Sequence, residues 1–435
     1  MNQKTLQPTV YRTWQLAWPL ILGNASIPLL GLADTAIAGR IPGATDLAAI
    51  SLGASWITLL FWAFSFLRQS TGGLTAQAVG RSDASSRRGL IHKGLVFALA
   101  AGLSLMALGH ALLAPLLEVL TLETDLANRV SVYLAIRLYG APAALVLYVL
   151  YGSLIGQGLS KHAVVLLAGM NVLNLGLNAW LGLGLGWGAE GIAWGSLIAE
   201  YTAAAAALFW LTRMDPKLFE KWQLKGIRTL LTANAWVMLR TLALLSVMTW
   251  MSTKSAQFGE QQAAITAVLM LLLNVAAYAL DGFADAAEIQ VGQAIGRSQP
   301  KTVKLALKST AWCSGLSALA ASIGLFIASE ALVWLLVPQP EIADAIQPWL
   351  GYVIPLPLIA WVSYWLDGVF LGFGAFKQMA KVMLASTAVF FPLQILWEDM
   401  TGLWRAFILW QLIRAGLMFW IYWNRLRAEL FLSRF

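Results

Sequence analysis

The chain has 435 residues, of which 59% are hydrophobic and only 11% are charged. A soluble domain carries roughly 25% charged residues, so this composition excludes a soluble globular protein and indicates an integral membrane protein. The net charge of +8 would suit a nucleic-acid partner, but the basic residues collect in loops on one side of the predicted spans, so we expect no nucleic-acid binding.

Apolar runs of about 20–28 residues recur along the chain, and each can cross a hydrocarbon core of about 30 Å as a helix. They lack the alternation of a membrane β-barrel, so we predict an all-α bundle. The side that carries the N-terminus holds 22 of the 29 Lys and Arg residues, which predicts that both termini are cytoplasmic. We expect a multi-pass protein of the bacterial cytoplasmic (inner) membrane. The twelve predicted spans are residues 12–38, 47–68, 89–114, 129–157, 162–185, 189–212, 228–251, 262–289, 304–330, 346–372, 378–397 and 402–424.

The chain carries an internal repeat. The hexapeptide Gln77–Ser82 returns almost unchanged as Gln293–Ser298, half the chain further on, and we call this separation the repeat offset. The same offset aligns glycines of Leu150–Lys161 with those of Leu366–Lys377. A duplicated unit of six spans predicts two lobes related by a parallel pseudo-twofold repeat, as in transporters that rock two bundles around a site. The predicted parts are an N-lobe at 1–212, a cytoplasmic linker at 213–227 and a C-lobe at 228–435.

The first predicted span contains a proline and an acidic residue. Asp34 is the only carboxylate that we find within the spans of the first half, and an ionisable residue in a membrane helix is a functional hypothesis by default. Pro28 precedes it in the same span, removes a backbone hydrogen bond and makes this helix able to bend. The other interpretation is that Asp34 lies near the outer interface and simply reaches water.

The fifth span carries three asparagines, Asn171, Asn174 and Asn178, whose spacing of three and four residues places them on one helix face. Amides in lipid need hydrogen-bond partners, so this face should look into the bundle. A carboxylate on the first span that faces these amides would form a protonation site, because the neutral acid can hydrogen-bond to them. Alternatively, the amides only hold neighbouring helices together.

The second half is more highly charged within its spans. Asp281, Asp285 and Glu288 lie at i, i+4 and i+7 of one helix and therefore share a face. One interpretation is an ion-pair network that closes a cytoplasmic gate, and the other is a second cation or substrate site. Three further charged residues lie within the spans of this half: Arg240, Asp367 and Arg414.

The sequence lacks the residues that disulfides, metal sites and nucleotide hydrolysis require. Cys313 is the single cysteine, which excludes an intramolecular disulfide, and the three histidines are too scattered to form a metal site. The sequence contains no Gly-rich phosphate loop. We therefore expect neither an enzyme nor a bound cofactor, and only a coupling ion, H⁺ or alternatively Na⁺.

Four stretches of the chain carry a recognisable family pattern: Pro28–Ala36, Phe66–Ala78, Gly188–Ser196 and Leu280–Glu288. They resemble the multidrug and toxic compound extrusion (MATE) family, particularly its DinF-like branch. The resemblance covers essentially the whole chain and implies a twelve-helix secondary transporter that exports organic cations and other amphipathic compounds against a proton or sodium gradient. We expect small-molecule drugs or organic cations and the lipid bilayer as its partners, and a monomer.

Carried over by position, the resemblance implies that Asp34 is the carboxylate protonated during transport, with Tyr133, Asn174 and Ser196 as its polar companions. Relatives often carry a second carboxylate where this chain has Asn178. A two-carboxylate cation site is therefore not expected in the N-lobe. Because sodium prefers several hard oxygen ligands, we favour proton coupling over sodium coupling.

Two other transporter classes compete with this interpretation. A major facilitator also has twelve helices in two halves, but the loop Gly80–Gly89 fits its basic motif poorly. A lipid-linked saccharide flippase of the same superfamily would need a strongly basic cavity for pyrophosphate. The cations within the predicted spans are few: Arg68, Arg137, Arg240 and Arg414.

Overall fold

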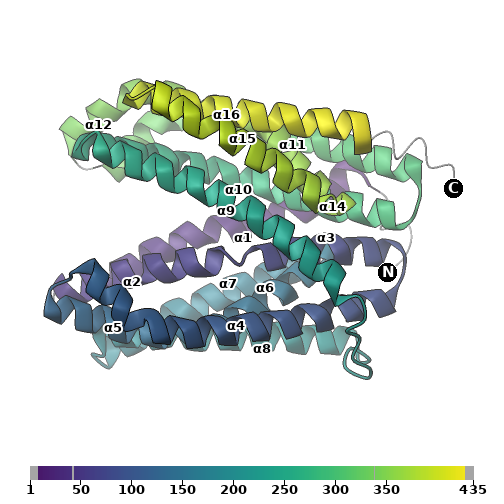
Figure 1. Cartoon of the computed structure of the whole chain (residues 1–435), viewed down its shortest axis with the longest axis horizontal. Helices are drawn as coiled ribbons and strands as arrows, with labels where there is room; N and C mark the ends of the chain where they lie inside the picture. Colours follow the sequence, from purple (N-terminus) through teal and green to yellow (C-terminus); the bar gives the residue numbers. More distant parts are fainter. Residues whose placement is uncertain (1–7, 42–43, 338, 427–435) are drawn as a thin grey trace. The chain divides into compact units, whose positions relative to one another are not determined.

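The computed structural model describes residues 8–41, 44–337 and 339–426, without the side chains of 26–36, 44, 120, 425 and 426. Within this part the chain is helical and contains no strand, which confirms the predicted all-α class (Figure 1). The helices of the first half are α1 (Val10–Ala38), α2 (Ala44–Trp62), α3 (Phe66–Gly80), α4 (Ala84–Leu120), α5 (Thr124–Leu138), α6 (Ala141–Gly156), α7 (Ser160–Leu177), η2 (Asn178–Gly184) and α8 (Gly188–Met214).

The second half begins with three long helices and then becomes more broken. Pro348 and Pro355 lie in the broken part, where their missing N–H groups interrupt the helical hydrogen-bond ladder. The elements are α9 (Ile227–Gln257), α10 (Glu260–Gly296), α11 (Pro300–Leu336), α12 (Pro340–Ile346), η3 (Gln347–Trp349), α13 (Leu350–Val353), α14 (Leu356–Phe373), α15 (Phe376–Leu396), α16 (Met400–Ile421) and η4 (Tyr422–Leu426).

Ten helical segments of the described part are long and apolar enough to cross a membrane, and α5 with α6 forms an eleventh span bent by 45°. The second predicted span is longer than expected, because α2 and α3 together run from Thr45 to Gly80. Helix α1, 29 residues long, covers the predicted span 12–38. Each predicted span therefore has a helical counterpart.

The repeat is visible in where helices begin and end. Helix α4 begins at Ala84 and α11 at Pro300, and they end at Leu120 and Leu336, so both pairs are separated by the repeat offset. Local geometry follows the same offset: Ser82 and Ser298 both have positive φ angles, of 56° and 55°. Such angles are uncommon outside glycine, so their recurrence in both hexapeptides indicates a common turn rather than chance similarity.

The repeated glycines have equivalent neighbours. A Cβ added to Gly152 would meet the backbone of Arg68, and one added to Gly368 would meet the backbone of Ala284. Gly152 and Gly368 are separated by the repeat offset, and so are the residues that they touch, Arg68 and Ala284. Glycine therefore permits the same close helix approach in each half.

The chain forms two compact units. The N-unit comprises Ala25–Thr75 and Asp83–Asn234, and the C-unit comprises Met1–Asn24, Ala76–Ser82 and Ala235–Phe435. In the N-unit, α4 packs on α6 and α2 packs on α5. In the C-unit, α10 packs along both α11 and α14. The division into lobes at 1–212 and 228–435 stays a prediction from the repeat.

Repeat-related glycines meet inside the C-unit. A Cβ on Gly80 would clash with the backbone of Gln293 and Gly296, and a Cβ on Gly296 would clash with the backbone of Gln77 and Gly80. The contact is thus reciprocal between the ends of α3 and α10. Beside it, Gln77 donates to the carbonyl of Gly372 at 2.9 Å.

The linker between α8 and α9 is held against the start of α4 within the N-unit. Arg87 and Arg88 donate to Asp215 at 2.8 and 2.7 Å. Partial burial alone would raise the pKa of Asp215, but the hydrogen bonds from Arg88 and Arg87 outweigh it and lower that pKa. His92 adds a ring contact with Trp222, with centroids 4.7 Å apart. These contacts order the linker on α4.

The reciprocal glycine contact can be tested by adding one methyl group. We expect Gly80→Ala and Gly296→Ala each to lower the free energy of unfolding by about 1–3 kcal/mol, because the new Cβ must displace backbone. Gly169→Ala is the control, since nothing lies within 4 Å of its added Cβ. Thermal unfolding of the purified variants in detergent measures the effect. Equal stability of all three variants would contradict the close packing.

Candidate functional site

A chain of hydrogen bonds links three of the predicted site residues in the N-unit. Asn178 donates to the side-chain oxygen of Asn174 at 3.1 Å, and Asn174 donates to the hydroxyl of Ser196 at 2.9 Å. Asn178 is fully buried and Asn174 is 7% exposed. The i, i+4 spacing thus places both amides on the inward face of the helix, as predicted. We name Asn174, Asn178 and Ser196 the amide chain.

The helix changes its hydrogen-bond pattern at this point. Helix α7 ends at Leu177, and the π-helical turn η2 begins at Asn178. The side-chain oxygen of Asn178 lies against Gly195 of α8, where any larger residue would clash with it. Single π turns occur frequently at functional sites. The sequence contained no signal for this turn, because it depends on how α8 packs against α7.

The other predicted members of this site are only partly described. Tyr133 on α5 is 3% exposed and packs its ring against Gly53 of α2. The side chains of Asp34 and Pro28 lie outside the described residues, so their proposed roles stay predictions. The described part of the predicted site is therefore the amide chain with Tyr133 buried on a neighbouring helix.

The expectation that Asp34 is the only carboxylate within the first six spans is wrong. Glu200 on α8 lies within the predicted span 189–212, and its side chain is only 14% exposed. Arg137 at the end of α5 donates to Glu200 Oε1 at 2.7 Å. The sequence analysis had noted Arg137 as a cation without noticing its partner, because helix pairing is decided in three dimensions.

The Arg137–Glu200 pair lies at the bend between α5 and α6. The side chain of Glu200 leaves no room for a Cβ on Gly140, which lies in the bend. The next residue of α8, Tyr201, donates to the carbonyl of Tyr139 at 3.0 Å. Glu200 and Tyr201 of α8 therefore contact Gly140 and Tyr139, the two residues between α5 and α6. These contacts fix the bend.

The C-unit brings together charged residues from three helices. Arg240 of α9 donates to Asp367 Oδ2 of α14 at 2.5 Å. Arg414 of α16 donates to the same oxygen. All three residues are at least nine-tenths buried. Arg240 and Asp367, two of the five predicted members of the polar network, are thus in direct contact. Arg414 contacts the same carboxylate oxygen of Asp367.

The acidic face of α10 lies mostly in the interior of the C-unit. Glu288 is 1% exposed and Asp285 is 7% exposed. Asp281 is half-buried and lies within electrostatic reach of Tyr364, as do Arg414, Asp367 and Arg240. Asp281 therefore lies near the arginine pair.

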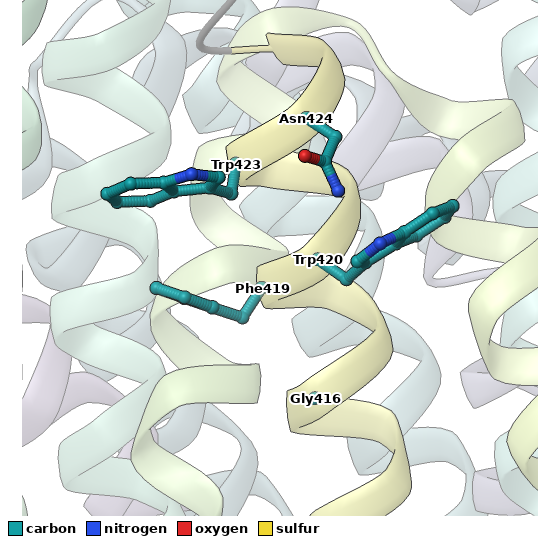
Figure 2. Close-up of a pocket in the computed structure, with 5 residues that line it drawn as sticks. All are labelled: Gly416, Phe419, Trp420, Trp423 and Asn424. Atoms are coloured by element: carbon teal, nitrogen blue, oxygen red, sulfur yellow. The ribbon is translucent and has the colours of Figure 1, made fainter.

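A surface groove occurs at the end of α16, where Figure 2 shows Phe419, Trp420 and Trp423 projecting around Gly416 and Asn424. The three rings are 46%, 58% and 51% exposed. Exposed aromatic rings at the end of a spanning helix are typical of the membrane–water interface. We therefore interpret this groove as a lipid-facing surface rather than a transport site.

Comparison with known proteins gives two matches to one family model. The model described as MatE matches residues 19–180 and 235–396, and these two matches are also separated by the repeat offset. DNA damage-inducible protein F of Escherichia coli K12 is 33% identical over 95% of this chain and 91% of its own length. Multidrug and toxin extrusion protein 2 of Mus musculus is 22% identical over 83% of this chain and 64% of its own length.

Solved structures show the same fold at low sequence identity. A crystal structure described as MATE in the straight conformation matches with a TM-score of 0.87 at 17% identity over 99% of both chains. Another, in the bent conformation, matches with a TM-score of 0.86 at 17% identity over 99% of this chain and 98% of that one. The two-lobed, twelve-helix architecture predicted from the repeat is thereby confirmed.

The buried Arg137–Glu200 pair predicts a specific pattern of stabilities. Arg137→Met should lower the free energy of unfolding by about 3–5 kcal/mol, because it leaves a buried carboxylate without its counter-charge. The double variant Arg137→Met/Glu200→Gln should lose less than the sum of its single changes, by roughly 0.5–3 kcal/mol. Thermal unfolding in detergent measures both.

Asp125→Asn is the control for this cycle. It breaks the contact between Arg129 and Asp125 at 3.3 Å, in which the two side chains are 44% and 64% exposed. We expect little change in stability, since exposed ion pairs contribute little. Strict additivity of the Arg137 and Glu200 changes would refute the coupling.

Proposed function

Because the chain belongs to the MATE family, whose members are transporters rather than enzymes, we propose that it is a secondary multidrug exporter. It exchanges organic cations and other amphipathic compounds for protons that enter the cell. The similarity to a mouse protein named for multidrug and toxin extrusion supports the substrate class. The amide chain of the N-unit is the observation that carries the coupling mechanism.

Proton coupling is favoured because the amide chain is neutral. Asn178, Asn174 and Ser196 are hydrogen-bonded in series, so the amide chain adds no second carboxylate to Asp34. A protonated carboxyl can exchange hydrogen bonds with amides and a hydroxyl, whereas a sodium ion prefers several hard oxygen ligands. A sodium-coupled exporter is the alternative, and separate gradients distinguish the two.

Protonation acts on the shape of the first helix in this proposal. A neutral Asp34 no longer needs water and favours a different arrangement of α1 against the amide chain, with Pro28 as the weak point. The ligand, here a proton, shifts the population toward the conformation that binds it better. The cavity then changes shape and releases the exported compound.

A flippase for lipid-linked saccharides is less well supported. Three arginines within the predicted spans already have carboxylate partners: Arg137 pairs with Glu200, while Arg240 and Arg414 share Asp367. A pyrophosphate group carries several negative charges and needs several uncompensated cations. The similarity to a protein of Escherichia coli supports a location in the bacterial inner membrane, where we place the exporter as a monomer. The distribution of basic residues predicts that both termini lie in the cytoplasm.

Reconstitution into liposomes tests the proposed function. The purified protein is placed in sealed vesicles, and ethidium movement is followed after a proton gradient or a sodium gradient is imposed separately. We expect movement under the proton gradient and none under the sodium gradient. Movement that follows sodium and ignores pH would replace proton coupling with sodium coupling, and no movement under either gradient would refute the exporter.

Asp34→Asn should abolish proton-driven ethidium movement, because the amide mimics the protonated acid and cannot cycle. Asp34→Glu keeps a titratable group and should retain part of the activity. Gel filtration and thermal unfolding check that both variants fold. Wild-type rates in Asp34→Asn liposomes would show that another residue carries the proton.

A further inference from the structure

In the C-unit, two guanidinium groups are in direct contact with a single carboxylate. Arg240, Arg414 and Asp367 are 9%, 3% and 8% exposed, so water screens their charges poorly. Both guanidinium groups donate to one oxygen, Asp367 Oδ2. Two cations therefore share one carboxylate, and one positive charge remains in excess among these three residues.

The cluster also has unused hydrogen-bonding capacity. The Nε atoms of Arg240 and Arg414 have no hydrogen-bond partner among the described residues, and neither has Asp367 Oδ1. A buried donor without an acceptor is costly, and most native proteins satisfy such groups. Guanidinium N–H groups are suited to oxyanions, to which they donate in a planar fork. Two unused N–H donors therefore indicate a place for an oxyanion.

Aromatic rings surround the more buried arginine. The guanidinium of Arg414 lies over the rings of Tyr364 and Trp410, 5.8 and 5.9 Å from their centroids. Such rings hold the guanidinium in place by cation–π attraction and provide an apolar wall. Asp281 also lies within electrostatic reach of Tyr364, and together with Asp367 it balances the two guanidinium charges. The site therefore combines an apolar wall with unused N–H donors.

We propose that Arg240 and Arg414 bind the anionic group of an amphipathic compound, such as an organic sulfate, sulfonate or carboxylate. The Nε–H groups donate to its oxygens, and Tyr364 and Trp410 contact its apolar body. A cation offers no acceptor to these N–H groups. Because Asp367 and Asp281 balance the two arginines, the site suits a monoanion rather than a pyrophosphate. This inference rests on the proposed exporter function and extends its substrates beyond organic cations.

Equilibrium binding of two radiolabelled probes tests the proposal without any gradient. Estrone sulfate is the amphipathic anion and tetraphenylphosphonium is the cation, and both are titrated onto purified protein in detergent by scintillation proximity. We expect Arg240→Met and Arg414→Met to weaken estrone sulfate binding by about tenfold or more, since each removes a charged hydrogen bond. Tetraphenylphosphonium binding should not weaken.

A substitution that should tighten anion binding provides a second, independent test. Asp281→Asn removes the nearby negative charge and should tighten estrone sulfate binding several-fold, even where an arginine variant fails to fold. Arg405→Met is the matched control, because Arg405 lies exposed on the same helix as Arg414. It should leave the binding of both probes unchanged.

The outcomes separate this proposal from the exporter function. If wild-type protein binds tetraphenylphosphonium but not estrone sulfate, the anion site is refuted and the exporter function stands. If folded Arg240→Met and Arg414→Met bind estrone sulfate as the wild type does, the cluster is only structural and the proposal fails. If neither probe binds the wild type, both proposals fail, whereas anion binding without gradient-driven movement supports the site and contradicts the exporter.

Discussion

Polar side chains inside membrane-spanning helices must be satisfied within the protein, because lipid offers them no hydrogen bonds. This protein meets that constraint in three ways. Asn178, Asn174 and Ser196 form a neutral chain of hydrogen bonds, and Arg137 and Glu200 form a one-to-one ion pair. In the third arrangement Arg240 and Arg414 share Asp367, and each keeps an Nε–H group without a partner among the described residues.

These arrangements suit different tasks. A one-to-one pair fixes structure, and Glu200 fixes the bend between α5 and α6 in this way. A neutral amide chain can accept or donate hydrogen bonds, so it tolerates a neighbouring acid in either protonation state. A cluster with unused guanidinium N–H groups favours ligands that carry oxygen acceptors. The charges carried by each cluster therefore distinguish a structural pair from a coupling site and from a binding site.

The fold could be predicted from the sequence because its signals are periodic and local. Span length, the constant repeat offset and the asparagine spacing can each be read along the chain without knowing which helices touch. The pairing of Glu200 with Arg137, the π turn at Asn178 and the sharing of Asp367 by two arginines depend on those contacts. No pattern within a single helix contains that information. The predicted roles of Asp34 and Pro28 stay untested, since their side chains lie outside the described residues.

The central claim is that proton and exported cation exclude each other through one carboxylate. Proton release on binding tests it most directly: tetraphenylphosphonium is added to purified protein in weakly buffered detergent solution at neutral pH, and released protons are counted. By linkage, a cation that prefers the ionised site must displace protons, so we predict proton release of up to one per bound cation in the wild type and none in Asp34→Asn. Cation binding without proton release, with an affinity independent of pH, would contradict the account.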